Sequence, residues 1–252
     1  EFGIPAGHWR LTESTGNAVK DTYYDALWRP VLTRERDASN SATTRYVKRA
    51  FDSEGRETFV SYASASSTPT TGIWTGYDAL GRPTSVSSDS EQGLLTTTTQ
   101  YLPGFRTQVT SPLGYQTNTW YQAFDQPTFD APTSISEPGG VTTTINRDAF
   151  GKPLSVTRSG YWNSTWQSLT RHFVYNPQQR LCKRVDPESG ATLLDYDAAG
   201  NLLWSARSAS LTNTTTCQTG SVGASIKSQR GYDARSRLSW ISHPAGTANE
   251  SF

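Results

Sequence analysis

A short motif that recurs nine times constrains this chain more than any other feature of its sequence. The clearest copy reads Tyr77-Asp78-Ala79-Leu80-Gly81-Arg82-Pro83-Thr84. The copies begin at Tyr24, Phe51, Tyr77, Tyr101, Tyr121, Arg147, Tyr175, Tyr196 and Tyr232. Successive copies start 20 to 36 residues apart. A recurrence of this period predicts a repeat protein, in which one small structural unit is stacked many times.

The residue types within the motif fit a strand that ends, turns and restarts. The first residue is aromatic in eight of the nine copies, which suits the end of a half-buried strand. The second is usually Asp, whose side chain accepts hydrogen bonds from the backbone of a turn. The fifth is often Gly, which supplies the positive φ of a tight hairpin loop, and the sixth is usually Arg or Lys. We therefore predict that each copy forms the turn of a β-hairpin.

A second turn signal precedes three of the copies. Pro112, Pro138 and Pro187 each lie nine residues before the start of the next copy, and Gly follows each of them within three residues. Pro presets the backbone of a turn and Gly allows it to bend sharply. One repeat therefore reads as turn, strand, turn, strand.

These two alternating signatures resemble the tyrosine-aspartate (YD) repeats of the RHS family. The stretch 186–201, DPESGATLLDYDAAGN, looks like a whole repeat with both turns, and the resemblance covers roughly Tyr24 to Pro244. It implies a β-sheet of hairpin repeats that spirals into a hollow shell. In bacterial members such a shell usually encloses a C-terminal toxin, and related shells occur in insecticidal toxin complexes and teneurins.

The predicted fold class is all-β, with β-hairpin repeats stacked into a curved, spiralling antiparallel sheet that forms a section of a hollow shell. Residues 1–23 are expected to be a degenerate leading repeat or a linker, and 24–252 the repeat array. An insert rich in Ser, Thr and Gly occupies about 208–228. We expect this insert to be a solvated excursion or a long hairpin rather than part of the core.

Composition narrows the function classes. Lys and Arg number 23 against 22 Asp and Glu, for a formal net charge of +1, so the chain has no basic excess that would favour nucleic acid. The longest apolar runs are far too short for a membrane span. The chain has no Met and begins with Glu1-Phe2, which we interpret as a processed or excised piece, and no signal peptide is visible.

No recognisable catalytic motif is present. The recurrent Asp residues occupy a repeated turn position, whereas an active site is a singular arrangement, so a structural role is expected for them. His8, His172 and His243 stand apart from any nucleophile motif. The self-cleaving aspartyl site of the RHS family has no match here. We expect a non-enzyme with no cofactor and no metal site.

Cys182 and Cys217 are the two cysteines of the chain. An even number of cysteines in a chain expected to be exported permits a disulfide, since the two residues could meet across neighbouring strands. The alternative is a pair of free, buried thiols. A zinc site is not expected, because two such distant cysteines have no clustered His partners.

Eight Trp residues leave two interpretations open. Exposed aromatic rings can stack on sugars, and members of the RHS family have been suspected of binding carbohydrate. Alternatively, the rings cover the sheet and form cross-strand pairs, which the positions of Trp74 and Trp120 near motif starts favour. Tyr161, Trp162 and Trp166 lie in an irregular extension and are the better candidates for ligand stacking.

The leading functional hypothesis is a structural shell segment of a bacterial secreted or surface protein that encloses a polypeptide such as a C-terminal toxin. Its partners would be that polypeptide and the remaining shell segments. The alternative is a module at the cell surface that binds carbohydrate or protein. Open strand edges would also favour self-association.

Overall fold

The computed structural model describes residues 8–123, 128–244 and 250–251. The chain divides into two compact units, the first formed by residues 1–103 and 107–117 and the second by 104–106 and 118–252. Within the described residues the regular structure is β-strand apart from two one-turn 3₁₀ helices, η1 (Thr219–Ser221) and η2 (Ala224–Ile226). None of the described helices is long and apolar enough to cross a membrane.

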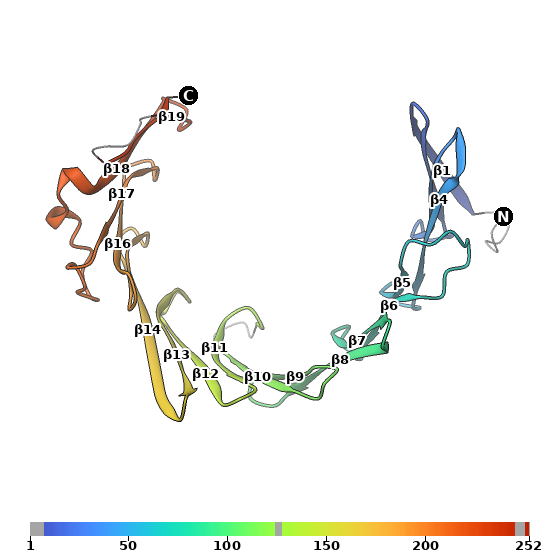
Figure 1. The fold of residues 1–252 in the computed structure, drawn as a ribbon, viewed down its shortest axis with the longest axis horizontal. Coiled ribbons are helices and arrows are strands. Elements are labelled where there is room, and N and C mark those ends of the chain that lie inside the picture. Colours follow the sequence, from blue (N-terminus) through green and yellow to red (C-terminus); the bar gives the residue numbers. More distant parts are fainter. Residues whose placement is uncertain (1–7, 124–127, 245–249, 252) are drawn as a thin grey trace. The chain divides into compact units, whose positions relative to one another are not determined.

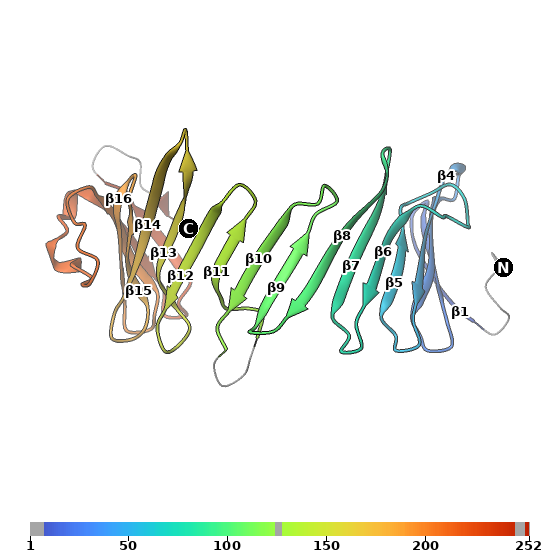
Figure 2. The same cartoon turned by 90° about the horizontal axis from the view of Figure 1, so that it is seen from below.

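The first unit is a series of antiparallel strands, each paired with the next along the chain (Figures 1 and 2). Its strands are β1 (Trp9–Thr15), β2 (Ala18–Tyr24), β3 (Pro30–Asp37), β4 (Asn40–Phe51), β5 (Glu57–Ser61), β6 (Gly72–Tyr77), β7 (Pro83–Ser90) and β8 (Gly93–Leu102). Two further strands, β9 (Arg106–Thr110) and β10 (Gln116–Tyr121), carry residues of both units.

The second unit repeats the same plan. The last four residues of β10 pair with β11, and each later strand pairs antiparallel with its successor. Its strands are β11 (Pro132–Glu137), β12 (Val141–Arg147), β13 (Pro153–Trp162), β14 (Thr165–Tyr175), β15 (Leu181–Asp186), β16 (Gly190–Tyr196), β17 (Leu202–Ser208), β18 (Lys227–Tyr232), β19 (Leu238–Ser242) and β20 (Glu250–Ser251).

The motif copies lie at the hairpin turns, as the sequence predicts. The first residue of a copy ends a strand in eight of the nine copies, and Tyr101 is the residue before the end of β8; the copies join strands from β2–β3 through β18–β19. The turn of the Tyr121 copy includes residues 124–127, which lie outside the described residues. The prediction of an all-β array of hairpins is confirmed.

The first 23 residues contribute paired strands. Within the described part of this stretch, β1 pairs with β2 from Trp9↔Tyr24 to Thr15↔Ala18. A loop follows β5, and Ser64 within it forms an isolated bridge with Tyr46. Gly72 then resumes regular pairing, opposite Ser61.

A β-bulge recurs directly after the motif turns. In β2–β3, Tyr23 pairs with Leu32 and Tyr24 with Pro30, so that Val31 is the extra residue. The same shift leaves one extra residue in seven further hairpins: Thr58, Thr84, Thr133, Leu154, Cys182, Leu203 and Ser239. Bulges bend a strand, increase its twist and re-aim a side chain. The repeat therefore has a bulge as well as a turn.

The insert behaves as expected only in part. Between Ser208 and Lys227 the chain forms a loop with η1 and η2, and most of its side chains are exposed. Val222 is nevertheless buried in an apolar cluster with residues of three strands, and Leu211 packs against the same cluster. The cluster residues of the strands are Val185 in β15, Ala191 and Leu193 in β16, and Trp204 and Ala206 in β17. Most of the insert is solvated, as expected, but the prediction that none of it belongs to the core is wrong, because Val222 is buried among side chains of β15, β16 and β17.

Candidate functional site

The motif turn is organised by its Asp. In the copy at Tyr77, Oδ1 of Asp78 accepts hydrogen bonds from the backbone N–H groups of Leu80 and Arg82, at 2.9 Å each. Its other oxygen, Oδ2, receives a hydrogen bond from Nε of Arg82 at 2.8 Å and lies 2.7 Å from the second guanidinium nitrogen. The turns at Asp25, Asp52 and Asp233 have the same arrangement. The carboxylates predicted to cap turns do so.

These contacts lower the pKa of the turn carboxylates. The backbone N–H of Arg82 holds the pKa of Asp78 below its usual value, against the opposing effect of partial desolvation, and the Arg82 side chain adds to it. Asp197, which is paired with Asn201 instead of Arg, also has a lowered pKa, because the Asn201 side chain and backbone donate hydrogen bonds to it. Such carboxylates stay ionised and hydrogen-bonded at neutral pH, which suits a structural role.

The fifth motif position requires a left-handed backbone whatever residue occupies it. Gly55, Gly81, Gly151 and Gly200 have φ between 78° and 95°. Four described copies without Gly keep a positive φ at this position, with Trp28 at 62°, Phe105 at 52°, Gln179 at 63° and Ser236 at 58°. The turn geometry therefore overrides the local preference of an L-residue.

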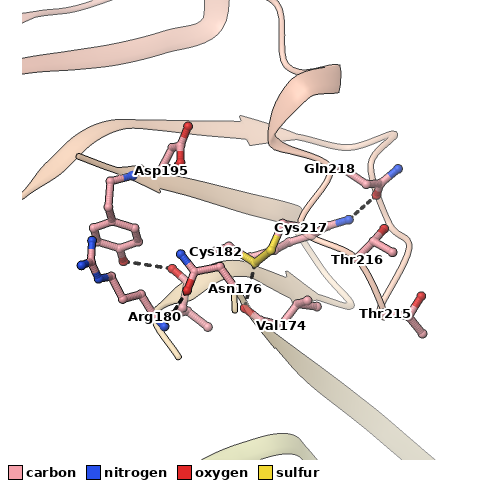
Figure 3. The surroundings of a disulfide bond; sticks show 12 residues. Val174, Asn176, Arg180, Cys182, Asp195, Thr215, Thr216, Cys217 and Gln218 are labelled. Atoms are coloured by element: carbon pink, nitrogen blue, oxygen red, sulfur yellow. Dashed lines mark hydrogen bonds between the residues drawn. A yellow bond between two sulfur atoms is a disulfide. The ribbon is translucent and has the colours of Figure 1, made fainter. Parts of the chain in front are cut away.

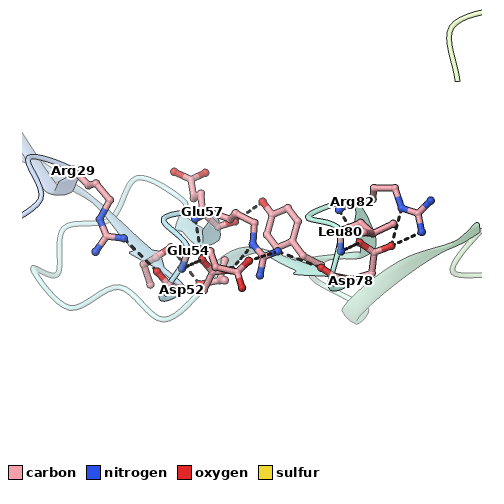
Figure 4. A network of polar contacts seen from close by, with 11 residues as sticks. Arg29, Asp52, Glu54, Glu57, Asp78, Leu80 and Arg82 are labelled. Atoms are coloured by element: carbon pink, nitrogen blue, oxygen red, sulfur yellow. Dashed lines mark hydrogen bonds and ion pairs between the residues drawn. The ribbon is translucent and has the colours of Figure 1, made fainter. Parts of the chain in front are cut away.

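The sixth residue links each turn to the following repeat. In the first unit the guanidinium carbons of Arg29 and Arg56 lie 4.9 Å from the ring centres of Phe51 and Tyr77, and that of Arg82 lies 4.0 Å from Tyr101. Nη1 of Arg29 and of Arg56 also donates to the backbone carbonyl of the next Asp, at 3.2 Å (Figure 4). We call this series of contacts the turn ladder.

The leading Tyr completes the turn ladder in the opposite direction. Its hydroxyl donates to a backbone carbonyl of the preceding repeat, directly after the sixth residue: Tyr77 to Glu57, Tyr101 to Pro83, Tyr175 to Pro153, Tyr196 to Leu181 and Tyr232 to Leu202. The motif thus encodes both a turn and its bonds to its neighbours. The sequence shows the turn, but not these bonds, since they depend on the spacing between strands.

Some Trp rings cover the sheet or pair with another ring, whereas others are exposed as a ligand-stacking role would require. Trp74 is half-buried against Phe59, with ring centres 4.9 Å apart, and Trp204 is buried in the apolar cluster. Trp9 and Trp28 are exposed but stacked on each other at 5.0 Å. Rings near motif positions therefore contact the sheet or another ring.

Tyr161, Trp162 and Trp166 lie together at the tip of the β13–β14 hairpin. Their exposed fractions are 68%, 73% and 52%. Tyr161 pairs with Trp166 across the two strands, and their rings meet edge to face with centres 5.1 Å apart. The structure thus brings together the three residues that the sequence singles out for ligand stacking, and leaves them open to solvent.

Cys182 and Cys217 form a disulfide, with Cα atoms 5.3 Å apart (Figure 3). The bond joins the bulge residue of β15 to the middle of the insert. Directly beside it, Nζ of Lys183 donates a hydrogen bond to Oε1 of Gln218. Lys183 is fully buried, and this desolvation lowers the pKa of its amine. The sequence does not reveal this buried Lys, because its partner Gln218 lies 35 residues away in the insert.

The sequence also did not indicate that two carboxylates, those of Asp21 and Asp186, are buried. Asp21 in β2 is buried and bonded to Thr12 and to Arg34 of β3, and these partners hold its pKa below the usual value against desolvation. Asp186 in β15 is buried between Arg171 and Arg184, with the same effect. Both carboxylates are fully engaged in ion pairs, so neither is placed as a free general base.

The histidines remain apart. His172 lies in β14, paired with Ser155 and Val185, whereas His243 lies 3.6 Å from Glu250 at the end of the second unit. The residues that the structure describes include no group of three or more His, Cys, Asp or Glu side chains suited to a metal.

Comparison with known proteins bears on the fold. No family model and no curated protein sequence matches this chain. Solved structures do match: the crystal structure of TcdB2-TccC3 superposes with a TM-score of 0.51 at 14% identity, covering 93% of this chain and 15% of that chain. The Tc holotoxin pore of Photorhabdus luminescens matches with a TM-score of 0.52 at 14% identity, covering 94% and 14%. The chain has an RHS-type fold.

The resemblance predicted from the YD repeats is thereby confirmed at the level of the fold. The chain spans about 15% of the length of the TcdB2-TccC3 chain that it matches. The structure of TcdB2-TccC3-Cdc42 matches equally, with a TM-score of 0.52 over 90% of this chain. At 14% identity these matches show a common architecture.

Proposed function

We propose that this chain is a wall segment of a hollow RHS-type container that encloses a polypeptide. The observation that carries the proposal is the match of nearly the whole chain to toxin-complex structures. The turn ladder supports it, since a wall needs many similar units joined to their neighbours. The enclosed polypeptide and the other wall segments are the partners of such a chain.

Confinement is the mechanism in this proposal. A wall of paired strands keeps an enclosed polypeptide away from proteases and from the cell that makes it, and pairing leaves few strand edges open to unwanted association. The wall itself needs no catalysis. The engaged state of the turn carboxylates and of Asp21 and Asp186 supports a non-enzymatic role. In this proposal the container acts outside the producing cell, and the protein is secreted or held at the cell surface.

Protease protection tests enclosure. A longer protein that contains this chain is treated with a nonspecific protease, first under native conditions and then in denaturant. We expect a polypeptide distinct from the repeats to survive the first treatment and to be digested in the second. An unfolded polypeptide added from outside serves as the control and is cut in both. Digestion of every non-repeat segment under native conditions would contradict enclosure.

A second candidate function is recognition of a glycan or protein surface by the β13–β14 tip. The observation that favours it is the exposure of Tyr161, Trp162 and Trp166 on one hairpin. Rings exposed in this way offer flat faces for stacking. Titration with a broad oligosaccharide panel would quench Trp fluorescence in the wild type but less in Trp162→Ala. The matched control is Trp9→Ala, and a flat response to every sugar would remove the glycan form of this candidate.

A further inference from the structure

The insert, residues 209–226, lies over strands β15, β16 and β17 and is fastened to them from its middle. It leaves β17 after Ser208 and returns to the sheet at Lys227. Cys217 is joined to Cys182 by the disulfide (Figure 3), and Gln218 accepts a hydrogen bond from Lys183. Val222 is buried among side chains of all three strands. The insert therefore covers both an apolar cluster and a buried amine.

The β-bulge explains how two consecutive residues of β15 both reach the insert. Lys183 pairs with Val174 and Leu181 with Tyr175, which leaves Cys182 as the extra residue. Neighbouring side chains of a regular strand point to opposite faces, whereas a bulge re-aims one of them. The sulfur of Cys182 and the amine of Lys183 thus meet Cys217 and Gln218, which are also consecutive.

Little within the insert itself fixes its position. Its two 3₁₀ helices are one turn each and have no side-chain cap, and Asn213 bonds to its own neighbours Thr215 and Thr216. Most of its residues are exposed. Ordering such a segment costs conformational entropy that the few attachments must offset. The disulfide is the covalent one among them.

We propose that the insert is a redox-sensitive lid, closed over β15–β17 while Cys182 and Cys217 are joined and opened when a dithiol reduces them. The attacking thiolate reaches Cys217, which is partly exposed, whereas Cys182 is 2% exposed. Attack on Sγ of Cys217 breaks the S–S bond and forms a mixed disulfide, and Cys182 leaves as a thiolate that takes up a proton.

The second thiol of the reductant completes the reaction. It attacks the reductant's own sulfur in the mixed disulfide and breaks the bond to Sγ of Cys217. The reductant departs as a cyclic disulfide, and Cys217 leaves as a thiolate that takes up a proton. Two electrons and two protons have then passed from the dithiol to the protein. The reduced Cys182 has an acceptor in place, because its Sγ lies 3.2 Å from the carbonyl oxygen of Val174. Thr58, a bulge residue of the first unit, makes the same contact with Ala50.

Hydrogen exchange of the full chain, before and after dithiothreitol, tests the lid. After reduction we expect exchange to rise about tenfold in peptides from the insert and from β17. Peptides from β5–β8 serve as the internal reference and should not change. Intact mass must show a gain of two hydrogens, and reoxidation must restore the slow exchange.

A variant without the two cysteines distinguishes loss of the disulfide from other effects of dithiothreitol on hydrogen exchange. The variant carries Cys182→Thr and Cys217→Ser. Thr is the residue found at the bulge positions Thr58 and Thr84, and its hydroxyl can donate to a backbone carbonyl as Thr58 does. We expect fast exchange in the insert without dithiothreitol and no further change with it. Slow exchange in the reduced wild type would overturn the proposal. A disulfide that resists dithiothreitol in the folded chain would overturn it as well.

Discussion

At the scale of single residues, the motif combines turn chemistry with contacts between repeats. The capping role of Asp78 follows from the sequence, because Asp in a turn has few other roles. The left-handed backbone at Trp28, Gln179 and Ser236 was not predictable from those residues, which do not favour it. It follows from their alignment with Gly81 in the repeat. The reach of Arg56 to Tyr77 depends on the register of neighbouring turns, which no single copy contains.

Two substitutions at the fifth motif position are expected to change the free energy of unfolding in opposite directions. Gly81→Ala forces an L-residue to φ 78° and is expected to lower the free energy of unfolding by about 1 kcal/mol. Ser236→Gly relieves the same conformation and is expected to raise it. Urea unfolding measures both midpoints. If both substitutions shifted the urea midpoint in the same direction by the same amount, the positive φ would not be what determines the residue at the fifth position.

The tyrosine hydroxyls of the turn ladder give a second prediction at this scale. Tyr77→Phe keeps the ring under Arg56 but removes the 2.8 Å bond to the carbonyl of Glu57. Loss of one such hydrogen bond is expected to cost about 0.5–1.5 kcal/mol of unfolding free energy. Tyr115→Phe, at an exposed hairpin position, is the matched control in the same urea titration. An identical midpoint for both variants would mean that the hydrogen bonds of the tyrosine hydroxyls do not stabilise the turn ladder.

At the scale of structural elements, the turns and strands were predictable, whereas the insert was not. Pro and Gly at fixed distances from each motif mark the hairpins. The insert is dominated by Ser, Thr and Gly, which indicates a solvated loop, and the burial of Val222 depends on the pocket that β15–β17 offer. The recurring bulge was equally hidden, because its residue is Val, Thr, Leu, Cys or Ser in different copies.

Lys183 gives a pH-dependent prediction at this scale. Its pKa is lowered in the folded state, so between the lowered value and the ordinary 10.5 the unfolded chain binds more protons than the folded one. Stability attributable to this residue therefore rises with pH through that window and levels off below it. Lys183→Met should flatten the dependence. Urea midpoints of the two proteins from about pH 8 to about pH 10 measure the difference, and parallel curves would contradict a lowered pKa for the Lys183 amine.

At the scale of the whole molecule, the fold class followed from repetition alone. Nine phased copies of one motif carry far more information than any copy does singly, and their turn chemistry leaves an antiparallel hairpin array as the consistent solution. What a wall of such hairpins contains is not encoded in its own residues. The enclosing function that we propose would therefore depend on a longer protein, and the proposal is tested there.

Intact mass of a longer protein that contains this chain tests enclosure most directly. The protein is purified natively and measured under native and then denaturing conditions. The account predicts that a second polypeptide remains with the repeats in the native measurement and separates only on denaturation. A single species under both conditions, or a second polypeptide already lost from the native protein, would contradict it.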